Sequence, residues 1–368
     1  MRRVLSLLLA VALLGGVGYA VYASVRDRAG AGGGGGARDV AVVRGLIGSE
    51  KAPFFADPEV AAVFARNGLR VQADTAGSRE IATSPRLAEY DFGFPAGVPA
   101  AERIRRDRKV TKSYQPFVTP MAIATFKPIA EILRANGVAA PLERGYWRFD
   151  MAAFLAMVAD DRRWNQLKGS AAYDSSKSVL ITSTDVRTSN SAAMYLAIAS
   201  YVLNDNSVVQ TSAQADKAVG RALPLFARQG LSATSSEEPF EDYLTIGMGK
   251  TPMVMVYEAQ YLARAVAKDG SIRDDMVLMY PTPTVVTKHT LVPLTPAGDR
   301  VGQLLTTDRD LKRLAAKYGF RTADVGSVDR LLAEKGIQAP PSLVDVVEPP
   351  TYDVLERLVK GIEARYGS

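Results

Sequence analysis

The 368-residue sequence contains no cysteine and only one histidine, His289. The lack of cysteine excludes disulfide bonds, thiolate metal sites, cysteine nucleophiles and lipid attachment through an N-terminal cysteine. With a single histidine, the chain also lacks the usual side-chain ligands of catalytic zinc. A catalytic serine would need His289 as its base, and no G-x-S-x-G motif is present. We therefore expect a protein that is not an enzyme, holds no metal and uses no cofactor.

Strongly charged tracts are also scarce. The formal net charge is +6, and the basic residues are spread along the chain. The densest basic run, residues 103–112, contains no aromatic side chain that could stack on a base. We therefore expect a solvated surface there and no binding to nucleic acid. Because 47% of the residues are hydrophobic, the chain can form one or two sizeable cores.

An apolar run without charge covers residues 4–23, after Arg2 and Arg3. About 20 such residues can span a bilayer, and this is longer than the usual core of a signal peptide. A glycine-rich tether follows at residues 30–36. We therefore expect residues 1–38 to form a transmembrane anchor and tether, with the rest of the chain outside the cytoplasm. The alternative is a cleaved signal, which would release a secreted protein.

Segments with strand patterns alternate with segments with helix patterns, and polar loops separate them. Residues 40–47 are a strand candidate, which leads to a helix expected over residues 58–67. Residues 179–181 are a second apolar run, which a hydroxyl-rich loop separates from the helical pattern of residues 194–202. This alternation predicts an α/β fold with largely parallel sheets.

Three of these loops present a serine beside glycine or beside further hydroxyls, namely Ser49, Ser78 and Ser189. In α/β sheets, ligands bind at the carboxyl ends of the strands, and the free amides of a following helix attract anions. A serine hydroxyl can both donate and accept a hydrogen bond there. The alternative is ordinary turn and capping chemistry. We expect the three serines to converge on one cleft.

The order of five motifs along the chain resembles the type II periplasmic, or extracellular, solute-binding proteins associated with ABC importers. The motifs are "GSEK", "AGSREIA", "TSTDVRTSNSAAMY", "YEAQ" and "LLTTDRDLKRLAAKYGFR", within residues 40–322. That family has two α/β lobes joined by two crossing strands, and the lobes close around the ligand. The resemblance implies crossing strands at residues 116–125 and 252–257.

The resemblance also implies a division into lobes. Lobe 1 would comprise residues 39–125 and 252–368, and lobe 2 would comprise residues 126–251. The C-terminal helix, with Leu358 on its apolar face, is expected to pack outside the cleft.

The ligand-binding residues that the resemblance implies are Ser49, Glu50, Lys51, Gly77, Ser78, Arg79, Asp185, Ser189, Asn190, Ser191, Tyr257 and Glu258. Lys51 and Arg79 favour an anion, whereas Glu50, Asp185 and Glu258 favour a cation or an amine. Because oxyanion-binding relatives use serines and helix amides, an oxyanion or a carboxylated metabolite is the favoured ligand. Ala192 stands where a glycine commonly ends the family's motif, and its side chain would limit close approach of a ligand to the backbone.

These observations predict a membrane-tethered extracytoplasmic solute-binding protein. It would capture a small polar, anionic ligand between two lobes, and an ABC permease would be its partner. The alternative is a surface interaction or signalling module that uses the same fold without transport, with another membrane protein as its partner.

Overall fold

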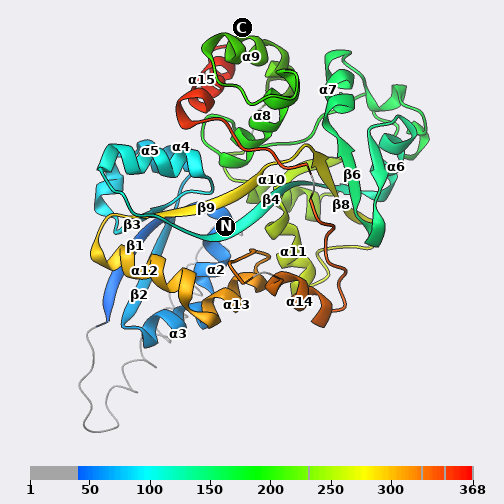
Figure 1. Cartoon of the computed structure of the whole chain (residues 1–368). Helices are drawn as coiled ribbons and strands as arrows, with labels where there is room; N and C mark the ends of the chain where they lie inside the picture. The colour runs from blue at the N-terminus through cyan, green and yellow to red at the C-terminus, as the bar shows by residue number, and fades with distance from the viewer. Residues whose placement is uncertain (1–39, 231–232, 325, 344, 367–368) are drawn as a thin grey trace, which may run out of the picture. The chain divides into compact units, whose positions relative to one another are not determined.

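The computed structural model describes residues 40–230, 233–324, 326–343 and 345–366 (Figure 1). The anchor and tether expected at residues 1–38 lie outside these residues. Across the described ranges, no helix is both long enough and apolar enough to cross a bilayer.

The described residues form a mixed α/β structure on a nine-stranded sheet, with the strand order β2-β1-β3-β9-β4-β8-β6-β5 and with β7 paired to β4. The strands are β1 (Ala41–Ile47), β2 (Leu69–Thr75), β3 (Phe92–Phe94), β4 (Tyr114–Phe126), β5 (Ala139–Pro141), β6 (Trp147–Asp150), β7 (Met253–Tyr257), β8 (Met276–Thr282) and β9 (Val286–Pro293). Strand β1 pairs parallel with β2 and β3, and β6 pairs parallel with β8. The remaining pairings between these named strands are antiparallel.

The expectation of largely parallel sheets is therefore wrong. It holds for β1 to β3, where a helix returns the chain between strands, but not around β4. Strand β9 lies antiparallel to the first half of β4, and β7 and β8 lie antiparallel to the second half. Apolar runs identify strands in a sequence, but they do not fix the direction in which the strands pair.

Strand β4 is 13 residues long and connects the two ends of the sheet (Figure 1). Both segments expected to cross are strands, β4 and β7, and they pair with each other, with Met121 opposite Tyr257. Strand β9 joins β4 to β3. The apolar run at residues 179–181 is not a strand; beside it, Thr182 forms an isolated parallel bridge with Val254.

The helices surround this sheet. They are η1 (Ser49–Lys51), α2 (Ala52–Ala56), α3 (Pro58–Arg66), α4 (Ser78–Thr83), η2 (Pro85–Glu89), α5 (Val98–Arg108), α6 (Lys127–Ala135), η3 (Glu143–Gly145), α7 (Met151–Ala159), η4 (Trp164–Gln166), η5 (Ser170–Ala172), α8 (Asn190–Leu203), α9 (Ser212–Ala227), α10 (Glu237–Thr245), α11 (Glu258–Ala267), α12 (Pro296–Thr307), α13 (Arg309–Lys317), α14 (Ser327–Glu334) and α15 (Tyr352–Glu363). The expected helix at residues 58–67 is α3, where the Asp57 side chain caps the Glu59 amide and Pro58 occupies the first turn.

The hydrophobic core divides into separate clusters. One cluster packs β1 and β3 against α3, α12 and α13, with Val43, Phe64 and Leu311 fully or almost fully buried. Leu46, on the other face of β1, packs in a second cluster with α4 and α5. The largest cluster packs β7, β8 and the second half of β4 against α6 to α10. The largest cluster therefore lies at one end of the sheet, and the two clusters that contain β1 residues lie at the other.

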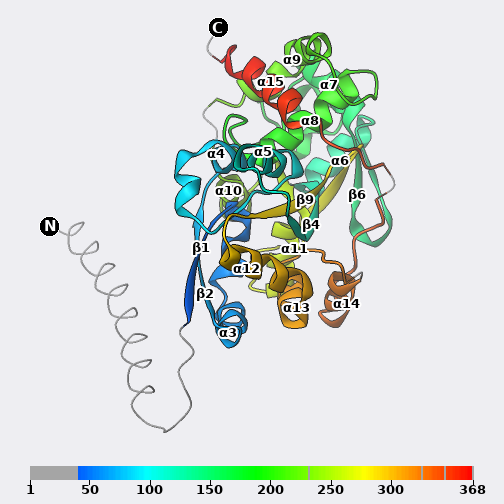
Figure 2. The same ribbon diagram turned by 60° about the vertical axis from the view of Figure 1, so that its left-hand side comes forward.

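The C-terminal helix α15 belongs to the largest cluster. Leu358 and Ile362 are fully buried there. Gly361 allows α15 to lie close to α9, because a Cβ at this position would lie 2.7 Å from a methyl carbon of Val219. Both views show α15 beside α8 and α9, and Figure 2 shows it extending towards α5.

Candidate functional site

The three serines each stand at the start of a helix. Ser49 opens η1 directly after β1, Ser78 opens α4 after β2, and Ser189 is the N-cap of α8. This placement follows from the sequence, because an apolar strand run is followed in the first two cases by a Gly-Ser pair and then by helix formers.

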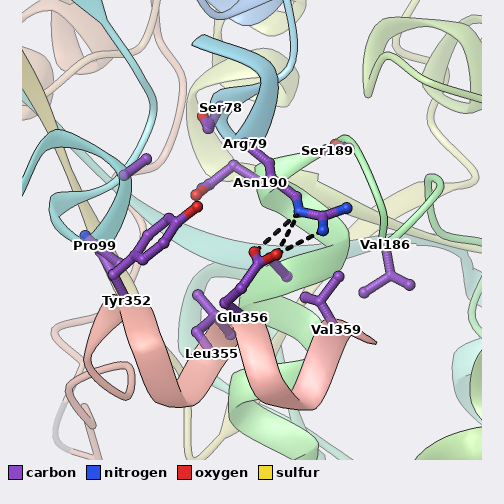
Figure 3. Close-up of a pocket in the computed structure, with 12 residues that line it drawn as sticks. Ser78, Arg79, Pro99, Val186, Ser189, Asn190, Tyr352, Leu355, Glu356 and Val359 are labelled. Atoms are coloured by element: carbon purple, nitrogen blue, oxygen red, sulfur yellow. Dashed lines mark hydrogen bonds and ion pairs between the residues drawn. The ribbon is translucent and has the colours of Figure 1, made fainter. Parts of the chain in front are cut away.

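Ser78 and Ser189 line one small cavity with Arg79 and Asn190 (Figure 3). Its remaining walls are Pro99, Ala100, Val186, Ala193, Tyr352, Leu355, Glu356 and Val359. The cavity volume is about 30 Å³, which is room for about two water molecules. Its lining therefore comes from four segments that are far apart in the sequence.

The two serine hydroxyls of this cavity have different hydrogen-bond partners. Ser78 Oγ accepts a hydrogen bond of 2.9 Å from the Ala96 amide, which fixes the loop before α5. Ser189 is the N-cap of α8, but its side chain accepts no hydrogen bond from a helix amide. Its Oγ instead lies 3.1 Å from Ser191 Oγ, and Ser191 contacts Thr184 Oγ1 at 2.8 Å. The first amides of this 14-residue helix therefore have no side-chain cap, and they carry the positive end of its dipole.

Arg79 is paired within the chain. Its Nη2 lies 2.6 Å from Glu356 Oε1, and its Nε donates to both carboxylate oxygens at 2.9 and 3.2 Å. Its Nη1 donates to the Arg187 carbonyl at 2.9 Å. The hydrogen bonds that Arg79 donates to Glu356 raise the pKa of Arg79 above its ordinary value. Arg79 therefore faces the cavity as part of a neutral pair.

Asp185 is also paired. Burial raises the pKa of its carboxyl, but hydrogen bonds from Arg187 outweigh burial and lower it overall. The Arg187 amide and side chain donate to this carboxylate at 2.5 to 3.0 Å. Asp185 does not line the cavity, and its pairing with Arg187 orders the loop before α8.

Asn190 connects the cavity to a buried polar cluster. Its Nδ2 donates to the Tyr257 hydroxyl at 3.0 Å, and the Tyr257 ring lies 5.6 Å from the His289 ring. His289 Nδ1 lies 3.2 Å from Lys51 Nζ and 3.3 Å from Glu50 Oε1. Lys51 is fully buried, pairs with Glu50 and lies over the Phe94 ring.

The protonation states in this cluster follow from burial and from the neighbouring charges. Burial raises the pKa of Glu50, but Lys51 and His289 together outweigh it and lower the pKa to about 2. Burial and the positive charge of Lys51 lower the pKa of His289 to about 4. Burial lowers the pKa of Lys51, and the charge of Glu50 opposes this shift. At pH 7 Glu50 is therefore ionised and the imidazole of His289 is neutral.

The remaining residues that were expected to bind the ligand do not line the cavity, and they contact other parts of the chain. Ser49 Oγ lies 2.9 Å from Ser235 Oγ. Glu258 is bound by Tyr280 at 2.8 Å and by Arg321 at 3.1 Å, and it does not line the cavity. Gly77 contacts the backbone of Thr188, since a Cβ at this position would lie 2.2 Å from the Thr188 carbonyl oxygen.

Sequence reasoning missed the contribution of α15. Tyr352, Leu355, Glu356 and Val359 line the same cavity as Ser78 and Ser189, whereas the C-terminal helix was expected to pack outside the cleft. The amphipathic pattern of α15 predicts a helix, but nothing in it predicts the partner of Glu356, which is 277 residues away in the sequence. The contact of His289 with Lys51 had no sequence signal either.

The stability of the protein should depend on pH through His289. Its pKa is about 4 in the folded protein and 6.5 when unfolded, so its neutral form stabilises the fold above pH 6.5, and this contribution is lost as the pH falls towards 4. Between pH 6.5 and 5 we expect the free energy of unfolding to fall by as much as about 1.4 kcal/mol per pH unit. Urea unfolding of wild type and His289→Asn over this range checks the prediction. Equal slopes for the two proteins would contradict it.

Comparison with known proteins identifies the fold of the chain. The sheet order and the surrounding helices define a mixed α/β fold on one nine-stranded sheet. No protein-family profile matches the chain. No curated protein matches it either.

Several solved structures match this chain in fold. The sulfate-binding protein SubI from Mycobacterium tuberculosis H37Rv has a TM-score of 0.52 and 13% identity, over 85% of this chain and 96% of that chain. A periplasmic thiamin binding protein has a TM-score of 0.54 and 10% identity, over 92% and 100%. Iron-bound HitA from Pseudomonas aeruginosa has a TM-score of 0.54 and 11% identity, over 89% and 100%. The chain therefore has the fold of the type II periplasmic solute-binding proteins. These neighbours are a sulfate-binding protein, a thiamin binding protein and an iron-bound protein, and at 10 to 13% identity the likeness concerns the fold.

Proposed function

We propose that the chain is an extracytoplasmic solute-binding protein that captures a small polar, anionic ligand between two closing lobes. The observation that carries this proposal is the convergence of Ser78, Ser189 and Asn190 beside the uncapped start of α8, with Tyr257 bound to Asn190. Free helix amides and hydroxyls are the groups that bind oxyanions and carboxylates without a formal cation.

The charge balance supports this mode of recognition. Lys51 and Arg79 are each neutralised by a glutamate, so neither offers an unpaired positive charge to a ligand. While these pairs are intact, the α8 amides and the hydroxyl donors are the groups that would meet the ligand's negative charge. We expect a compact oxyanion or a small carboxylate, because such groups accept several hydrogen bonds at once.

We further propose that the hydrophobic clusters at the two ends of the sheet are the cores of two lobes. Residues 39–125 and 252–368 would supply most of lobe 1, and residues 126–251 most of lobe 2, while β8 and α15 pack on the lobe 2 core. Residues 1–38 would tether the protein to the membrane, and an ABC permease would receive the ligand.

A second candidate is a surface interaction or signalling module with this fold. The observation that favours it is that the charged side chains lining the cavity, Arg79 and Glu356, are paired with each other. Such a site needs no ligand to neutralise its charged groups. The two candidates differ in whether a small molecule binds at α8.

Substitution of Ser189 tests the proposed function. Because its hydroxyl caps no helix amide, Ser189→Ala should leave the melting temperature nearly unchanged. It should weaken binding of the ligand by about 5- to 100-fold, because a buried ligand atom loses its hydrogen-bond partner. Calorimetric titration with sulfate, phosphate and succinate measures the affinity.

The matched control is Ser84→Ala. Ser84 caps η2 by accepting a hydrogen bond from the Arg86 amide, and it does not line the cavity. We expect this substitution to lower stability by about 1 kcal/mol and to leave affinity unchanged. If Ser189→Ala behaves in the same way as Ser84→Ala, the interaction module becomes the better account.

A further inference from the structure

The C-terminal helix α15 supplies one wall of the cavity, and its Glu356 side chain forms an ion pair with Arg79. Glu356 binds the Arg79 guanidinium through both carboxylate oxygens, as Figure 3 shows. Glu363 adds a second carboxylate at 3.7 Å. The side chains of Arg79 and Glu356 are 26% and 18% exposed, so the pair is largely shielded from water. The carboxylate of Glu356 therefore accepts the hydrogen bonds that the Arg79 guanidinium could otherwise donate to an anionic ligand.

The contacts of α15 differ in kind on its two sides. Towards α8 and α9 it buries Leu358 and Ile362, and its Gly361 lies against Val219. Towards α4 and α5 its contacts include the ion pairs of Glu356 and Glu363 with Arg79 and of Asp353 with Arg106, at 2.9 Å, and one partly buried ring, that of Tyr352. Buried apolar contacts are lost only at a large cost, whereas an ion pair can separate when each charge finds another partner.

Glu356 also has a second cation within reach. Lys360 lies one turn further along α15, with its Nζ 3.6 Å from Glu356 Oε1. A carboxylate released from Arg79 would therefore keep a partner on its own helix. Arg79, once released, would face the cavity with an unpaired positive charge.

We propose that Glu356 is an internal competitor for the anionic group of the ligand, and that its pair with Arg79 holds the cavity closed when no ligand is bound. This inference rests on the proposed function. When the cavity opens, α15 stays with α8 and α9, and the Arg79–Glu356 pair separates. A ligand with a carboxylate or another oxyanion takes the place of Glu356 at Arg79, while Glu356 pairs with Lys360.

The absence of cysteine from the chain allows a direct test. Spin labels on Arg108→Cys in α5 and Ala213→Cys in α9, both at exposed positions, report the separation of the two sides by electron–electron double resonance. In the ligand-free protein, Glu356→Gln should increase the population at longer distance. It should also strengthen binding of succinate or sulfate by about fivefold, because the competing charge is gone.

Asp216→Asn is the matched control. It removes the 2.8 Å pair between Asp216 of α9 and Arg357 of α15, on the side that is not expected to open. We expect it to change neither the distances nor the affinities. Unchanged distances and affinities in Glu356→Gln would overturn the inference. A shift to longer distance without binding of either probe would support the latch and count against the proposed anionic ligand.

Discussion

Replacing Gly77 with alanine should prevent full closure of the cavity and weaken ligand binding by about 100-fold. A Cβ at Gly77 would lie 2.2 Å from the Thr188 carbonyl oxygen and 2.8 Å from its carbon. Both contacts are with backbone, so no side-chain rotation can relieve them. Gly77 has φ −66° and ψ 149°, which alanine adopts without strain, so the fold itself should persist.

The size of this effect follows from the cost of the overlap. Inserting a methyl group into a closely packed contact costs up to about 3 kcal/mol, and each 1.4 kcal/mol that disfavours the closed form lowers apparent affinity about tenfold. Calorimetric titration with the anion that binds wild type most tightly measures it. The control is Gly220→Ala on α9, where a Cβ meets no other atom within 4 Å. Equal affinities for the two variants would show that Gly77 and Thr188 need not approach during binding.

Replacing Lys51 with methionine should destabilise the protein by about 3 to 5 kcal/mol. The substitution leaves the buried carboxylate of Glu50 without its cation, and an unpaired buried charge is among the most destabilising defects. Lys51 is fully buried, and its positive charge helps to hold the pKa of Glu50 at about 2. Urea unfolding at pH 7 measures the loss.

The double substitution Glu50→Gln with Lys51→Met should recover much of this stability, because it removes both charges together. Asp107→Asn is the surface control, since Asp107 pairs with Arg103 on exposed positions of α5 and should cost about 0.5 kcal/mol or less. A loss below about 1 kcal/mol for Lys51→Met would mean that Glu50 does not depend on Lys51.

Local sequence patterns predicted the helix starts of the candidate site. Ser49, Ser78 and Ser189 were placed correctly at helix starts because strand runs, glycine–serine pairs and caps are all encoded within a few residues. The α/β class and the type II binding fold were likewise recognisable from the order of short motifs in this sequence, although overall identity to the solved structures is only 10 to 13%.

Contacts between distant segments could not be predicted. The pairing of β4 with β7, β8 and β9 depends on strand directions that apolar runs do not encode. His289 and Lys51 are 238 residues apart, and Arg79 and Glu356 are 277 residues apart. A charged residue on an amphipathic helix has the same local pattern whether it faces water or another charge. For this reason the pairing of Arg79 within the chain, which removes its free charge from the cavity, was not foreseen.

Native mass spectrometry of protein purified without dialysis tests the central claim most directly. The claim is that the chain closes around a small ligand at the start of α8. We predict that wild type carries a bound small molecule, which is released on denaturation, and that Gly77→Ala carries none under the same conditions. Wild type and Gly77→Ala that both show only the mass of the polypeptide, and that both fail to bind sulfate, phosphate and succinate, would contradict the claim.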